Sequence, residues 1–170
     1  MNLIQHYVGG ELTSGSSNKK GKVFNPALGE QKSEVLLANK SDVNEVVSIA
    51  KKAFETWSQK PALQRARVMF KFKELIEKNS EELTELIVSE HGKVYEDAKG
   101  SLTRGLEVVE FACGIPQVLK GEFSENVGTN VDSWSIRQPL GVVAGITPFN
   151  FPAMVPMWMF PIAIACGNTF

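Results

Sequence analysis

A turn bounded by two prolines presents one side-chain amide between two aromatic residues, Pro148-Phe149-Asn150-Phe151-Pro152. It follows an apolar, β-branched stretch, Leu140 to Ile146, that is typical of a central strand in a parallel sheet. The carboxyl ends of such strands are where α/β proteins bind ligands. An amide placed there can donate a hydrogen bond to an oxygen that becomes negative during a reaction. The alternative is structural, because turn asparagines commonly cap the next helix or bond to turn backbone.

Arg104 is a second candidate, on a segment predicted to be helical from Val94 to Val118. The segment has two apolar stripes, and a helix that is apolar on both sides is expected to pack on both. Arg104 lies one turn before the second stripe, and a buried guanidinium needs a partner. It could bind an anionic ligand, or form a weak surface ion pair with Glu107. The stripes are Leu102, Leu106, Val109 and Cys113, and then Val108, Phe111 and Ile115.

Neither cysteine is predicted to be a nucleophile. Cys113 and Cys166 are far apart in apolar surroundings, where a thiol has a raised pKa and is unreactive. Their spacing supports no disulfide framework and no metal site, so we expect a reducing compartment, the cytoplasm. His6 and His91 are predicted to be surface residues.

Composition limits the class of protein. The chain has 18 basic and 19 acidic residues, is 43% hydrophobic and 22% charged, and so is typical of a soluble globular protein. This balance of charge favours neither a nucleic-acid nor a membrane partner. The opening residues show no signal or transit pattern.

The end of the sequence is uncharged from Gln138 to Phe170. A membrane-associated segment is one interpretation. Five prolines interrupt the segment, however, and each interior proline costs a helix about 3 kcal/mol. A buried strand, a turn and a helix from Pro152 to Cys166 are therefore favoured. Such a strand needs neighbours that these residues do not provide, so the sequence predicts that the chain is part of a longer protein.

Upstream elements are predicted from turn residues and periodicity. A hairpin is expected at 6–15, a turn at 25–30 and a strand at 34–38. Helices are expected from a Ser41 cap to Trp57, from Pro61 to about Ile76, and from a Ser80 cap to Glu90 with Gly92 ending it. Residues 121–130 are predicted to be a turn region, and 131–138 an exposed or interface strand.

The segment from Pro139 to Phe170, PLGVVAGITPFNFPAMVPMWMFPIAIACGNTF, resembles the aldehyde dehydrogenase superfamily without a gap. In that family a PLGV strand leads to a Pro-aromatic-Asn-aromatic-Pro turn, and the asparagine amide forms the oxyanion hole. The opening hairpin, the Asn-Pro-x-x-Gly-Glu turn at 25–30 and the helix with Arg65 and Arg67 also have counterparts. The resemblance therefore extends over the whole chain.

Within the superfamily, the chain resembles the methylmalonate-semialdehyde dehydrogenases, which acylate coenzyme A. Phe149 stands where many relatives have tryptophan, and the strings 104–110 and 154–161 match. The resemblance implies that Asn150 is catalytic and that Arg104 binds the substrate carboxylate. It also implies that Thr147, Pro148 and Phe149 contact NAD. The family's catalytic cysteine, its general-base glutamate and a lysine that binds the NAD ribose are expected beyond residue 170.

The resemblance also implies an α/β fold: part of a Rossmann-like NAD-binding domain, with a helical layer and a β oligomerisation arm. Residues 1–120 and 139–170 are assigned to the domain and 121–138 to the arm. The expected activity of the parent enzyme, a homotetramer, is NAD- and coenzyme A-dependent oxidation of malonate or methylmalonate semialdehyde. We expect this chain alone to be inactive, with no metal. The alternatives are an aldehyde dehydrogenase that releases a free acid, a truncated structural partner of intact subunits, and a membrane-associated fragment.

Overall fold

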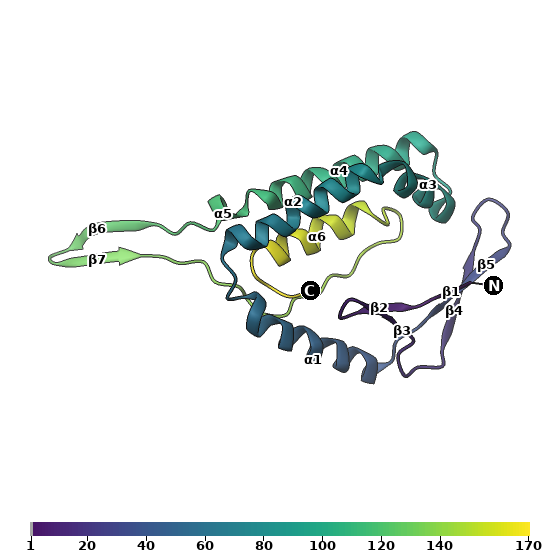
Figure 1. Ribbon diagram of the computed structural model, residues 1–170, viewed down its shortest axis with the longest axis horizontal. Helices are drawn as coiled ribbons and strands as arrows, with labels where there is room; N and C mark the ends of the chain where they lie inside the picture. Colours follow the sequence, from purple (N-terminus) through teal and green to yellow (C-terminus); the bar gives the residue numbers. More distant parts are fainter. Residues whose placement is uncertain (1) are drawn as a thin grey trace.

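A computed structural model describes residues 2–170, and Figure 1 shows a helical layer flanked by small β elements. The helices α2, α4 and α6 lie side by side, while α1 lies apart from them beneath the layer. The hairpin of β6 and β7 projects from one end of the molecule. The helices are α1 Lys40–Trp57, α2 Ala62–Lys78, α3 Ser80–His91, α4 Tyr95–Cys113, α5 Ile115–Val118 and α6 Met154–Ala165.

The strands form three separate small sheets. In the first, β1 (Asn2–Ile4) pairs in parallel with β5 (Gln31–Leu36), which pairs antiparallel with β4 (Lys20–Phe24). The second is the predicted amino-terminal hairpin, β2 (His6–Val8) and β3 (Glu11–Thr13). Its two-residue turn is Gly9-Gly10, both with positive φ, which fits the twist of a tight hairpin. The third pairs β6 (Phe123–Gly128) with β7 (Val131–Trp134).

Helix α1 begins two residues earlier than the proposed Ser41 cap implies. Asn39 is the cap: its side chain accepts from the Asp42 backbone N–H at 3.0 Å, and the Asp42 carboxylate accepts from the Asn39 N–H at 2.9 Å. Asp42 also accepts from the backbone and the hydroxyl of Ser16, 26 residues earlier. The Asn39 N–H, and then Ser16, lower the pKa of the Asp42 carboxyl. The cap is thus fixed by a tertiary contact that local sequence does not show.

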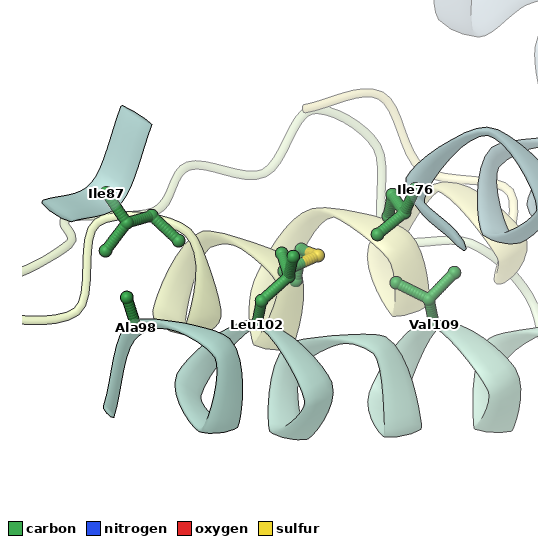
Figure 2. Packing of buried hydrophobic residues seen from close by; sticks show 6 residues of the cluster. Ile76, Ile87, Ala98, Leu102 and Val109 are labelled. Atoms are coloured by element: carbon green, nitrogen blue, oxygen red, sulfur yellow. The ribbon is translucent and has the colours of Figure 1, made fainter. Parts of the chain in front are cut away.

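The helical layer is held by α4, which packs against α2, α3 and α6. Figure 2 shows the buried cluster in which α4 meets its neighbours. The first predicted stripe of α4 is confirmed, because Leu102, Val109 and Cys113 are buried. The cluster comprises Ile76, Ile87, Ala98, Leu102, Val109 and Met157, and a second cluster comprises Met69, Ala112, Cys113, Ile115 and Ala165.

A close approach of α4 to α6 depends on Gly105. A Cβ at Gly105 would lie 3.2 Å from the backbone Cα of Met154, so a larger residue would separate the two helices.

The predicted single helix from 94 to 118 is instead two helices, because the chain turns at Gly114 between α4 and α5. Gly92 ends α3 in the left-handed conformation, as predicted.

Two predictions for the last third of the chain are wrong. Residues 140–146 form no strand: one parallel bridge joins Val142 to Thr169, and Leu140 and Ile146 are 90% and 95% exposed. A central strand needs hydrogen-bonded neighbours on both sides, and the described part of the chain supplies only Thr169. Residues 121–130 are not simply a turn region, because they contain β6 and the turn is confined to 129–130.

The uncharged end of the sequence forms one short helix, α6, of 12 residues. Over residues 2–170, no helix has the length and apolar character needed to cross a membrane.

Candidate active-site turn

The turn that carries Asn150 joins the extended segment 140–148 to α6. Asn150 is exposed, and within residues 2–170 its side chain has no hydrogen-bond partner. Helix α6 is capped at Ala153 without any side-chain hydrogen bond. The capping role that a turn asparagine often has is therefore not the role of Asn150 here. Its amide is free to donate to a ligand.

The start of the extended segment is fixed to the end of α6 by Asn168. The buried Asn168 side-chain oxygen accepts from the backbone N–H groups of Leu140 at 2.7 Å and Gly141 at 3.1 Å. The backbone of Thr169 adds a hydrogen bond to Gly141 and one from Val143. These contacts set the direction in which the segment leaves the helical layer.

Arg65 in turn holds the end of α6. Its side chain is 6% exposed, and its Nε donates to the carbonyl oxygen of Ala165 at 2.9 Å, while Nη1 donates to the carbonyl of Lys60. Trp57 Nε1 donates to the neighbouring carbonyl of Ile164 at 3.0 Å. Sequence analysis noted Arg65 only as a family counterpart. The spacing of Arg65, Met69 and Ile76, which places them on one helix face, is the signal that predicts its burial.

Thr147, Pro148 and Phe149 lie between these anchors and Asn150, and all three are exposed, Phe149 to 91%. In the described residues, positions 144–150 make no hydrogen bonds, so their backbone groups and the Thr147 hydroxyl are available to a ligand. The segment is nevertheless held close to the core at Gly145, where a Cβ would overlap Phe170 and Met159.

An open groove of about 670 Å³ lies beside this segment. Residues 142–145 form one wall, the β2–β3 hairpin and α1 form the others, and the lining includes the apolar residues Val43, Val46 and Val47.

Arg104 lies on the exposed surface of α4, one turn from Val108. Phe111, on the same predicted stripe, is 53% exposed, whereas Val108 is half-buried and Ile115 is 1% exposed, so the stripe is buried at its carboxyl end and not at Phe111. Arg104 also makes no ion pair with Glu107 or with any other described residue. Its backbone carbonyl accepts from Trp158 Nε1 of α6 at 3.4 Å, and its guanidinium is free to bind an anion.

The two cysteines have the character predicted for them. Burial raises the pKa of Cys113, whose thiol donates to the Val109 carbonyl at 3.4 Å. Burial also raises the pKa of Cys166, and the Arg65 guanidinium partly opposes that rise. Neither thiol is poised to become a nucleophilic thiolate.

His6 and His91, which were predicted to be surface residues, are both partly exposed, but one ring nitrogen of each is shielded from solvent. His6 Nε2 and His91 Nδ1 are buried without a hydrogen-bond partner. Among residues 2–170 no group of three or more His, Cys, Asp and Glu side chains could hold a metal ion.

Comparison with known proteins identifies the family. The aldehyde dehydrogenase family model matches residues 12–170. The chain belongs to the aldehyde dehydrogenase family. The resemblance of the asparagine turn and of the preceding helices to this family is therefore confirmed.

The similarity to individual aldehyde dehydrogenases covers essentially the whole chain. It is 51% identical over 170 residues to a malonate-semialdehyde dehydrogenase from Pseudomonas aeruginosa, matching 100% of this chain and 34% of that protein. It is 51% identical over 168 residues to malonate-semialdehyde dehydrogenase 1 of Geobacillus kaustophilus, again matching 34% of the relative. This aldehyde dehydrogenase chain thus spans about a third of the length of the curated relatives it matches.

Solved structures give the same fold. A methylmalonate-semialdehyde dehydrogenase from Oceanimonas doudoroffii superposes with a TM-score of 0.95 at 55% identity, over 99% of this chain and 34% of that one. A Sinorhizobium meliloti protein assigned to the same enzyme, complexed with NAD, superposes with a TM-score of 0.95 at 49% identity over the same shares. The mixed α/β fold predicted from sequence is therefore the aldehyde dehydrogenase fold.

Proposed function

We propose that this chain supplies the amino-terminal third of an NAD-dependent dehydrogenase that oxidises malonate or methylmalonate semialdehyde. The observation that carries the proposal is its identity of 51% to a malonate-semialdehyde dehydrogenase over the whole chain. The exposed, unpaired Asn150 supports it from the structure, since the amide is free to take the catalytic role that the family gives this asparagine. The groove beside residues 142–145 is the place where neighbouring strands of the complete enzyme would pack.

Asn150 would act on the aldehyde oxygen. As a nucleophile attacks the carbonyl carbon, that oxygen gains negative charge, and the Asn150 side-chain N–H donates a hydrogen bond to it. A donor that stabilises this charge more than it stabilises the bound aldehyde lowers the barrier. The nucleophile itself is not among residues 1–170 in this proposal, because Cys113 is buried, Cys166 is partly buried, and burial raises the pKa of both thiols.

NAD supplies the acceptor for the hydride when it is bound. The structure of the Sinorhizobium meliloti relative contains NAD. In this chain the residues fit one wall of such a site, because the backbone around Thr147, Pro148 and Phe149 is exposed and makes no hydrogen bonds within residues 2–170. Their part would be to position the cofactor beside the substrate carbon and to keep water from it.

Arg104 would select the substrate by binding its carboxylate. A guanidinium offers two parallel N–H donors, which match the two oxygens of a carboxylate. Among residues 2–170 Arg104 makes no ion pair, which leaves those donors unoccupied. Coenzyme A as acyl acceptor, which the subfamily resemblance implies, belongs to the same proposal. Release of a free acid is the alternative outcome.

The β6–β7 hairpin would be the oligomerisation arm. All residues from 121 to 138 are exposed, and the hairpin projects from the helical layer (Figure 1). A two-stranded ribbon alone buries little, so it gains stability by pairing with another surface. Assembly as a homotetramer and a cytoplasmic location stay predictions.

A hybrid enzyme tests this proposal. Residues 1–170 would replace the matching residues of the Pseudomonas aeruginosa malonate-semialdehyde dehydrogenase, and NADH formation from malonate semialdehyde would be followed with and without coenzyme A. We expect activity that depends on coenzyme A and yields an acyl-CoA. A folded hybrid that reduces no NAD would refute the function, and activity with free acid as the product would refute only the acylating step.

A further inference from the structure

A cation outside the Asn150 turn contacts the turn in the described part of the chain. The Lys93 ammonium nitrogen lies 4.2 Å from the centroid of the Phe151 ring, within the range of a cation–π interaction. Phe151 directly follows Asn150 in sequence and is half-buried, whereas residues 144–150 are all exposed. Lys93 therefore contacts Phe151, the aromatic neighbour of Asn150 that is partly buried.

Lys93 is itself held in place by its surroundings. It follows Gly92, whose left-handed φ of 83° ends α3 and whose Cα faces Pro26, where a Cβ would come within 3.0 Å. The Lys93 ammonium also lies 3.5 Å from the hydroxyl of Ser101, a buried residue of α4 that donates to the Asp97 carbonyl at 2.7 Å. The cation is therefore fixed between the end of α3 and the first turns of α4.

The rest of the turn has little to hold it. Between Gly145, which packs on Met159 and Phe170, and Phe151, no residue hydrogen-bonds to another described residue. The Phe151 carbonyl accepts from the Val155 N–H at 3.3 Å, which fixes the backbone on the helix side only. Lys93 thus contacts the ring of the residue that directly follows Asn150.

We infer that Lys93 is a positioning residue for the reaction, which aligns the Asn150 amide by holding the Phe151 ring. The inference rests on the proposed function of Asn150. Lys93 touches no reacting atom in this scheme. It acts only through Phe151, and its effect is therefore on the alignment of the oxyanion donor.

The test uses the hybrid enzyme and measures kcat and KM. Lys93→Met keeps the length of the side chain but removes the charge, and we expect kcat to fall by about 2- to 30-fold, the range spanned by exposed and desolvated cation–π contacts. Lys93→Arg, which keeps a cation over the ring, should restore most of the rate. Lys99→Met is the matched control, since Lys99 is an exposed lysine on α4, and its rate should be unchanged.

A double-mutant cycle separates positioning from a general effect on folding. In an Asn150→Ala background, and in a Phe151→Leu background, Lys93→Met should cause little further loss, because its route to the reaction is already removed. Equal losses in all backgrounds would overturn the inference. So would a Lys93→Met enzyme that matches the Lys99→Met control while Asn150→Ala is impaired. If Asn150→Ala itself is fully active, the proposed function fails, whatever Lys93 does. Should Lys93→Met lower the yield of folded enzyme, Phe151→Leu compared with wild type gives the same test.

Discussion

Replacing Arg65 by methionine should destabilise the chain, because Arg65 ties α2 to the end of α6. The substitution keeps an unbranched apolar stem and removes both guanidinium hydrogen bonds, to the carbonyls of Ala165 and Lys60. Ala165 is fully buried, so its carbonyl is left without a partner, at a cost of about 1–3 kcal/mol. Lys60 is exposed, and water can replace that bond.

The substitution loses the charge-assisted hydrogen bond to Ala165 and leaves that carbonyl without a partner, and both changes destabilise the folded chain. It also removes the unfavourable burial of a guanidinium, and this partly offsets the loss. We therefore expect the free energy of unfolding to fall by about 2–4 kcal/mol. Urea unfolding of the 170-residue chain, followed by tryptophan fluorescence and by circular dichroism, measures this change. One of the three tryptophans, Trp57, donates to the adjacent Ile164 carbonyl and so lies at the same junction.

Arg67→Met is the matched control, because Arg67 is an exposed arginine two residues away on the same helix. It should change the unfolding free energy by less than about 0.5 kcal/mol. If Arg65→Met and Arg67→Met have the same stability, the Arg65 contacts do not hold α6, and the account of how the Asn168 junction is positioned is wrong.

Three further predictions concern substrate, pH and the isolated chain. In the hybrid enzyme, Arg104→Leu should lower kcat/KM for malonate semialdehyde by about 10- to 150-fold, the value of a charge-assisted hydrogen bond, and leave propanal oxidation almost unchanged. Equal losses on both substrates would show that Arg104 is structural. Because the pKa of Asp42 is lowered in the folded chain, its contribution to stability is present above the ordinary carboxyl pKa and is lost as the pH falls through the lowered one. The stability difference between wild type and Asp42→Asn should therefore shrink on acidification in chemical unfolding, and a constant difference would contradict this. The isolated 170-residue chain should form no NADH from malonate semialdehyde at 340 nm, since neither of its thiols is poised for attack, and NADH above a buffer blank would refute this.

The helical layer could be predicted from sequence because its stripes follow helical periodicity. The buried faces of α2, α3 and α4 are marked by residues three and four apart, and the observed ends of α2 and α3 fall close to the predicted ones, whereas α4 ends earlier than predicted, at Cys113. The cap of α1 was misplaced because Asn39 and Ser41 are both good caps. The contact of Asp42 with Ser16, 26 residues away, decides between them.

Residues 140–146 show the limit of pattern alone. Their apolar, β-branched composition describes a strand with neighbours on both sides, and residues 2–170 provide one bridge, to Thr169. The same reasoning explains Arg104 and Phe111, which are exposed on a stripe that is buried at Ile115. The sequence pattern indicates which sides of a strand or helix need packing partners. The described residues supply only some of these partners.

The asparagine turn was found because proline, aromatic and amide residues stand together in sequence. The residues that support this turn were not predicted from the sequence, because their contact partners are distant along the chain. Arg65 binds a carbonyl 100 residues away and Asn168 binds backbone 28 residues away. Lys93, which lies over Phe151, belongs to the connection between two other helices. Contacts of this kind require the tertiary structure.

The central claim is that Asn150 donates to the developing oxyanion, and its direct test is the rate of the Asn150→Ala variant of the hybrid enzyme. NADH formation from malonate semialdehyde would be measured at saturating NAD, together with the affinity for NAD. We predict that kcat falls by about 10²- to 10³-fold, the usual effect of removing one oxyanion donor, while NAD affinity changes little. A variant with the rate of the unmodified hybrid would show that Asn150 is only a turn residue and would contradict the account.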